Sequence, residues 1–167
     1  LRAVVATVAT VSDTVTAAIR DWPAAPIMVS DTAEKYGAFA AADAALAASG
    51  TVALELAMAS TPAVIAYKIN PLTAFLVRQL IKVRYVNLIN IVLDRPVVPE
   101  FLQKDCRPEK LAAAIDHLLG DAESRTQQIA AGRDALHRLG LGGPPTGERA
   151  AQVVLDLIER YSISNRG

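Results

Sequence analysis

Short apolar runs alternate with helix-forming stretches in the first half of this chain, and this alternation constrains the fold more than any other feature. Runs typical of β-strands cover residues 3–9, 26–29, 44–48 and 63–67, and residues 85–92 are also β-like. Stretches that favour helix lie between them, at residues 13–21, 32–42, 51–59 and 71–83. Such alternation predicts an α/β fold, a Rossmann-like parallel sheet with helices on both faces. Ligands of these sheets bind beyond the carboxyl ends of the strands.

The third apolar run leads directly into a turn that suits an anion. Ser49, Gly50 and Thr51 follow the run, and a helix is predicted immediately after them. A helix N-terminus offers unpaired N–H groups and a partial positive charge, which favour a phosphate group. Gly50 lets the backbone approach a ligand closely, and the two flanking hydroxyl groups add donors. The turn therefore predicts a phosphate site, although an ordinary capped turn has the same pattern.

Glu55 extends this predicted site along the helix. It follows Thr51 by four residues, so the two side chains lie on one face of the helix. A carboxylate one turn beyond a phosphate can accept hydrogen bonds from the hydroxyl groups of a ribose. The pattern thus favours a nucleotide ligand, and the alternative interpretation of Glu55 is a solvated helix carboxylate.

The bulk composition narrows the class of protein and its partners. The 167 residues are 52% hydrophobic, enough for one domain with a core. The formal net charge is zero and aromatic residues make up 5%, so we expect no nucleic-acid partner. Cys106 is the only cysteine and has no nearby histidine. We therefore predict no metal site and no cofactor.

The second half of the chain is predicted to be helical. Helices are expected at residues 108–119 and 123–139, and residues 140–147 hold four Gly and two Pro, which favour a hinge. The helix beyond the hinge carries an apolar face made of Val153, Val154, Leu157, Ile158 and Tyr161. We interpret residues 1–167 as a single domain truncated at its N-terminal side, with a C-terminal helix over residues 148–167.

A basic amphipathic helix is predicted between residues 70 and 84. Its apolar stripe consists of Phe75, Leu76, Leu80 and Ile81. Arg78 and Lys82 are neighbours on the same helix, four residues apart. Basic amphipathic helices can lie on anionic membranes, so this segment is a candidate membrane-facing surface. The alternative is a helix packed on the core with a solvated basic edge.

Several later segments, taken together with residues 49–55, resemble one family. They are Pro62-Ala63-Val64-Ile65-Ala66-Tyr67-Lys68, Asn70-Pro71-Leu72-Thr73, Lys82-Val83-Arg84-Tyr85-Val86-Asn87-Leu88-Ile89-Asn90-Ile91 and Val98-Pro99-Glu100-Phe101-Leu102-Gln103. In this order they strongly resemble the lipid-A-disaccharide synthase family. The resemblance is close over residues 1–119 and looser through the C-terminal helices.

The resemblance implies the C-terminal, UDP-binding half of a glycosyltransferase of the GT-B type. Members of the family transfer 2,3-diacylglucosamine from UDP to 2,3-diacylglucosamine 1-phosphate, with inversion, and form the β-1,6 lipid A disaccharide. The resemblance also implies a bacterial enzyme that is peripheral on the cytoplasmic face of the inner membrane, and a homodimer. By the same resemblance Ser49, Gly50, Thr51, Glu55, Glu100 and Gln103 bind UDP, and Asn90 is catalytic.

Two elements of the family are missing from the 167 residues. The family's Gly-Ser-Arg element, whose Arg is expected to neutralise the diphosphate, would precede the segment that begins at Leu1. The acceptor domain with its general base is also missing, so the chain alone is predicted to be inactive. Two alternatives stay open at this point: a domain like that of UDP-N-acetylglucosamine 2-epimerase, and a non-catalytic nucleotide-binding module.

Overall fold

The computed structural model describes residues 1–48, 50–70 and 84–164. Its strands are β1 Val4–Ala6, β2 Ile27–Val29, β3 Ala45–Ala48, β4 Ala63–Tyr67 and β5 Glu100–Leu102. Its α-helices are α1 Ser12–Ile19, α2 Thr32–Ala41, α3 Val52–Met58, α5 Leu88–Leu93, α6 Pro108–Gly120, α7 Ala122–Arg138 and α8 Thr146–Ser164. Short 3-10 helices span Ala9–Val11 and Gln103–Asp105. Ser49 and the predicted amphipathic helix at 71–83 lie outside the described residues.

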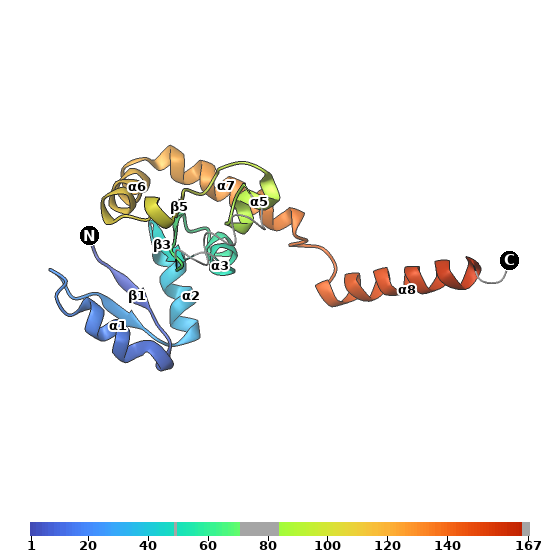
Figure 1. Ribbon diagram of the computed structural model, residues 1–167, viewed down its shortest axis with the longest axis horizontal. Coiled ribbons are helices and arrows are strands. Elements are labelled where there is room, and N and C mark those ends of the chain that lie inside the picture. The colour runs from blue at the N-terminus through green and yellow to red at the C-terminus, as the bar shows by residue number, and fades with distance from the viewer. Residues whose placement is uncertain (49, 71–83, 165–167) are drawn as a thin grey trace.

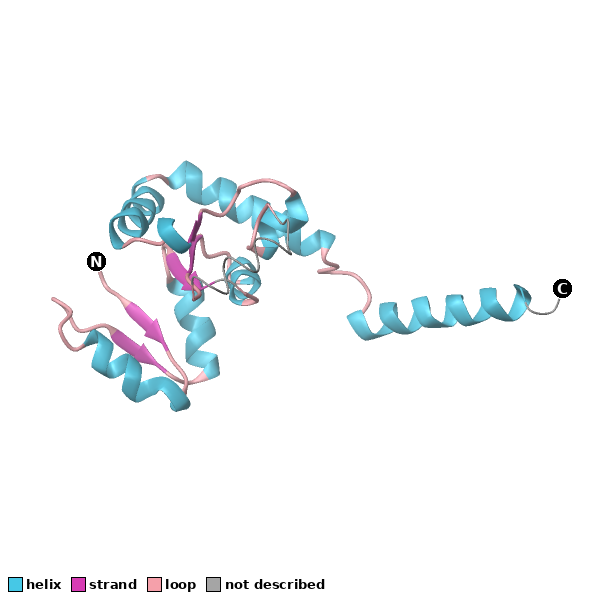
Figure 2. Cartoon of the chain, in the orientation of Figure 1, coloured by secondary structure: helices cyan, strands magenta, loops and turns pink. Residues whose placement is uncertain are grey.

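The described strands form two parallel sheets (Figure 2). One sheet pairs β1 with β2, and the other has the order β3-β4-β5. The predicted α/β class with parallel strands and intervening helices is therefore confirmed. The expected single sheet is divided in two within the described part of the chain, because β1 pairs only with β2 there.

The prediction of a β-like segment at residues 85–92 is wrong. Leu88–Leu93 is helical, because Asn87 caps the helix: its backbone is extended and its side-chain Oδ1 accepts a hydrogen bond from the N–H of Ile89 at 2.7 Å. A strand that the periodicity did not indicate, β5, lies further on and pairs Ile65 with Glu100. A strand of three residues is too short to show alternation.

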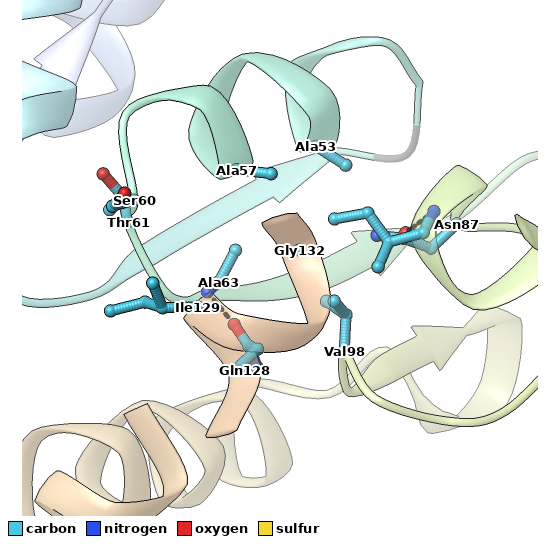
Figure 3. A pocket seen from close by; sticks show the side chains of 11 residues that line it. Ala53, Ala57, Ser60, Thr61, Ala63, Asn87, Val98, Gln128, Ile129 and Gly132 are labelled. Carbon is cyan, nitrogen blue, oxygen red and sulfur yellow. Dashed lines mark hydrogen bonds between the residues drawn. The ribbon is translucent and has the colours of Figure 1, made fainter. Parts of the chain in front are cut away.

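The main core lies between the second sheet and the helices α3, α5 and α7. Ile65 of β4 is fully buried, and it clusters with Ala53 of α3, Ile89 of α5 and Ala135 of α7. Helices α3 and α7 approach closely at Gly132, where an added Cβ would lie 3.2 Å from the Cβ of Ala57 (Figure 3). A small residue is needed there for the two helices to pack.

Helix α8 extends away from the rest of the molecule (Figure 1). A turn with positive φ at Gly140 and Gly142 precedes it, and Arg149 donates a hydrogen bond to the carbonyl of Leu139 at 3.2 Å. The apolar side chains predicted to form one face are exposed, including Val153 at 60% and Tyr161 at 72%. The helix begins at Thr146, two residues before the predicted start.

Candidate nucleotide site

The turn after β3 has the backbone geometry that a glycine permits. Gly50 has a φ of +145°, and an added Cβ would meet no atom within 4 Å, so the space beside it is open. Thr51 follows it in the N-cap position of α3; its side chain is exposed and makes no hydrogen bond to cap the helix. Its hydroxyl group is therefore a candidate contact for a ligand that approaches the turn.

Glu55 lies in the first turn of α3 and is held from a second helix. Its Oε2 accepts a hydrogen bond from Nζ of Lys35 on α2 at 2.8 Å, and the two side chains are 29% and 30% exposed. This carboxylate raises the pKa of the Lys35 ammonium above its ordinary value of 10.5. Glu55 is thus an ordered, partly exposed carboxylate rather than a freely solvated one.

Asn90 is buried, with 1% of its surface exposed, and all four of its hydrogen-bonding positions are used. Its Oδ1 accepts from the N–H groups of Val97 and Val98, both at 2.9 Å. Its Nδ2 donates to the carbonyl of Val98 at 2.8 Å and to Oε1 of Glu100 at 2.6 Å. The side chain therefore fixes the loop that leads from α5 into β5.

Glu100, at the start of β5, ties that strand to the beginning of α5. Its Oε2 accepts from the N–H of Val86 and its Oε1 from the N–H of Asn87, both at 2.9 Å. Together with the bond from Asn90, three donors converge on one partly buried carboxylate. Such convergence holds the backbone at residues 86–87 in place.

Gln103 follows the end of β5 and reaches the chain beyond β4. Its backbone has a φ of +50°, and its Oε1 accepts a hydrogen bond from the N–H of Ile69 at 3.3 Å. Glu100 and Gln103 therefore bind backbone on the two sides of segment 71–83, near residues 86–87 and at residue 69. The Glu-x-x-Gln spacing places one anchor at each end of β5.

The sheet brings Thr51, Ile69 and Gln103 to one edge. Strands β3, β4 and β5 are parallel neighbours, so their carboxyl ends meet at the same edge. Thr51 follows the end of β3, Ile69 the end of β4, and Gln103 the end of β5. This is the edge at which ligands of parallel α/β sheets bind.

The model of one known family, described as lipid-A-disaccharide synthetase, matches residues 13–153. The chain belongs to this family. It is 55% identical to the lipid-A-disaccharide synthase of Paramagnetospirillum magneticum, over 100% of this chain and 43% of that protein. It is 52% identical to the enzyme of the same name from Rhodospirillum centenum, over 99% of this chain and 41% of that protein. The chain thus spans about two-fifths of the length of these curated relatives.

Membership of the lipid-A-disaccharide synthase family decides between the glycosyltransferase and the epimerase-like alternatives in favour of the former. The sequence alone did not indicate Lys35 as a partner of Glu55, because twenty residues separate them and the contact forms only when α2 and α3 pack.

One small crevice in the body of the protein lies away from the carboxyl edge of the second sheet. The crevice, of about 10 Å³, lies between α3 and α7 and is lined by Ala57, Asn87 and Gly132, among others (Figure 3). It has space for about one water and none for a nucleotide. Nδ2 of Asn87 is buried there and has no hydrogen-bond partner among the described residues. This crevice is therefore not the candidate nucleotide site.

Two kinds of feature are absent from the described ranges, 1–48, 50–70 and 84–164. Within them, no three His, Cys, Asp or Glu side chains are grouped so that they could hold a metal ion. None of the helices in the same ranges is both long enough and apolar enough to cross a membrane.

Proposed function

We propose that this chain is the donor-binding part of an inverting glycosyltransferase. The reaction transfers 2,3-diacylglucosamine from UDP to 2,3-diacylglucosamine 1-phosphate and forms the β-1,6 lipid A disaccharide. The observation that carries the proposal is the turn from Gly50 to Glu55 at the carboxyl edge of β3, in a chain that belongs to the lipid-A-disaccharide synthase family. The chain spans two-fifths of its relatives, so the acceptor and the remaining chemistry belong to the longer protein.

In this proposal the turn binds the diphosphate of the donor. The open space beside Gly50 lets phosphate oxygens approach the backbone N–H groups, and the Thr51 hydroxyl donates a further hydrogen bond. Ser49, which lies outside the described residues, is assigned the same role from the sequence. Donors fixed at this position would stabilise the negative charge that develops on UDP as the bond to the sugar breaks.

Glu55 would bind the ribose of the same ligand. Its carboxylate lies one helical turn from Thr51, and about 30% of it is exposed. A hydrogen bond to a charged acceptor contributes about 1.5–3 kcal/mol. This contribution would distinguish UDP from a ligand that lacks the ribose hydroxyl groups.

We propose that Asn90, Glu100 and Gln103 support the donor site by holding nearby backbone in place. Each uses its side chain to hold backbone: Asn90 the loop before β5, Glu100 the start of α5, and Gln103 the chain after β4. Because every polar atom of Asn90 already has a partner, we propose that it positions the site and does not contact the reacting atoms. This proposed positioning role differs from the catalytic role that the family resemblance implies for Asn90.

We propose two partners, the inner-membrane surface and a second copy of the chain. The substrates carry acyl chains, so the enzyme would act at the cytoplasmic face of the bacterial inner membrane as a peripheral protein. The exposed apolar face of α8 is a candidate contact for a second copy of the chain, which would give a homodimer.

Substitution of Glu55 tests the donor site. We expect Glu55→Ala to weaken UDP binding by about 10- to 150-fold, which corresponds to 1.5–3 kcal/mol. Calorimetric titration of the 167-residue chain with UDP measures the change. Glu109→Ala is the matched control, because Glu109 occupies the first turn of α6 instead. Equal UDP affinities for the folded Glu55→Ala and Glu109→Ala variants would refute the assigned role.

A further inference from the structure

The ammonium group of Lys35 lies at the candidate nucleotide site but is not one of the predicted site residues. It comes from the first turn of α2, whereas the turn and Glu55 belong to α3. We propose that Lys35 is a positioning residue for nucleoside recognition, which aims the Glu55 carboxylate at the ribose hydroxyl groups. This inference rests on the proposed function and deepens it.

The geometry gives each carboxylate oxygen of Glu55 a separate task. Nζ of Lys35 bonds Oε2 at 2.8 Å, which fixes the rotamer of a side chain that would otherwise sample several. The proposal assigns the other oxygen, Oε1, to a ribose hydroxyl group. Both side chains are about 30% exposed, so a ligand can reach the pair without displacing the lysine.

Lys35 is itself held in position by its own helix. Its Nζ lies 4.5 Å from the ring centroid of Tyr36 and 5.7 Å from that of Phe39, and these two rings pack edge to face. Cations are attracted to aromatic faces at these distances. The start of α2 is fixed as well, because Asp31 Oδ1 accepts from the N–H of Ala33 at 2.8 Å. The lysine therefore presents an ordered charge to Glu55.

Stability alone does not account for this arrangement. An ion pair with 30% exposure on both sides contributes little to folding, because water and salt screen it. The same pair does place one positive charge beside the carboxylate, one helical turn from the proposed diphosphate turn. Loss of the lysine should therefore change ligand binding more than it changes the free energy of unfolding.

The test compares UDP with 2′,3′-dideoxyuridine diphosphate, which keeps the diphosphate and lacks both ribose hydroxyl groups. We expect Lys35→Met to weaken binding of UDP by about 5-fold, and to change binding of the dideoxy compound by less than about 2-fold. Lys35→Arg should restore UDP affinity, since a guanidinium can also pair with Oε2. Lys110→Met is the matched control, because it breaks the exposed Lys110–Asp105 ion pair, in which Glu55 takes no part.

The outcomes separate this inference from the proposed function. If the wild-type chain does not bind UDP, the proposed function falls and the inference falls with it. If UDP binds and Lys35→Met equals Lys110→Met, the inference alone is wrong. Equal losses for both nucleotides would also overturn it, because the lysine would then act on the diphosphate. Thermal unfolding of each variant, measured in parallel, identifies any loss that comes from unfolding.

Discussion

The N-terminal part of the chain, from β1 to β2, buries far fewer apolar side chains than the part from α3 to α7. Only Val29 among the described residues up to β2 is buried, whereas Val4 and Ile27 in the same sheet are 44% and 47% exposed. The described residues of the second part include twelve buried apolar side chains between Ala53 and Leu136. Parallel strands are normally covered on both faces, and two strands alone are marginally stable. The second part therefore holds most of the folding free energy.

The described residues of the second part also include buried polar side chains, and those of Thr61, Asn90 and Gln128 connect different elements. Asn90 ties the loop before β5, and Gln128 of α7 accepts a hydrogen bond from the N–H of Ala63 at the start of β4 (Figure 3). Thr61 donates to the carbonyl of Phe39 at the end of α2 at 2.5 Å. Such bonds satisfy backbone groups that burial would otherwise leave unpaired. The better-packed part therefore contains a polar network that supports the proposed donor site.

Among the substitutions that test this contrast, removal of the Asn90 amide should lower the free energy of unfolding most. We expect Asn90→Ala to lower the free energy of unfolding by about 3 kcal/mol or more, because buried backbone groups at Val97 and Val98 lose their partner. Urea unfolding measures the change. Gln152→Ala, which removes an exposed amide of α8, is the control and should change stability by less than about 0.5 kcal/mol. Equal stabilities for the two variants would show that the network around Asn90 is not structural.

The same substitution in the two sheets compares the two parts directly. Val64 of β4 is fully buried, and Val4 of β1 is 44% exposed. We expect Val64→Ala to cost about 2–3 kcal/mol, from lost burial and the cavity left behind, and Val4→Ala to cost less than about 1 kcal/mol. Urea unfolding of the two variants gives the difference. If Val4→Ala costs as much as Val64→Ala, the N-terminal sheet is as well packed as the second one, and the contrast is wrong.

Removal of α8 should have the smallest effect on stability. The helix stands apart from the body, and its described apolar side chains are exposed, so we expect deletion of residues 146–167 to change the free energy of unfolding by less than about 0.5 kcal/mol at low concentration. Light scattering on both chains tests the proposed homodimer, whose mass should fall to that of one chain after the deletion. A loss of stability above about 1 kcal/mol in the monomer would mean that α8 packs on its own body.

Local sequence determined most of the secondary structure. Strand β4 has the predicted bounds, because Pro62 precedes it. Helix α2 begins at the predicted residue, because Asp31 caps it. The glycine-rich loop before α8 and the turn at Gly50 were also visible as local patterns, and positive φ at glycine follows from its missing side chain. Glu55 could be chosen as a site residue from its spacing to Thr51 alone.

The tertiary structure decided what each chosen residue contacts. Asn90 and Glu100 are ten residues apart and meet only because β5 pairs with β4, and Lys35 meets Glu55 only because α2 packs beside α3. Whether residues 85–92 form a strand or a helix was decided in the same way, since an apolar run fits either until a cap and its neighbours select one. Local propensities act over one or two turns, whereas hydrogen bonds between distant segments depend on how the whole core packs. The sequence thus determined the class of the fold and the candidate site residues, and packing determined what those residues contact.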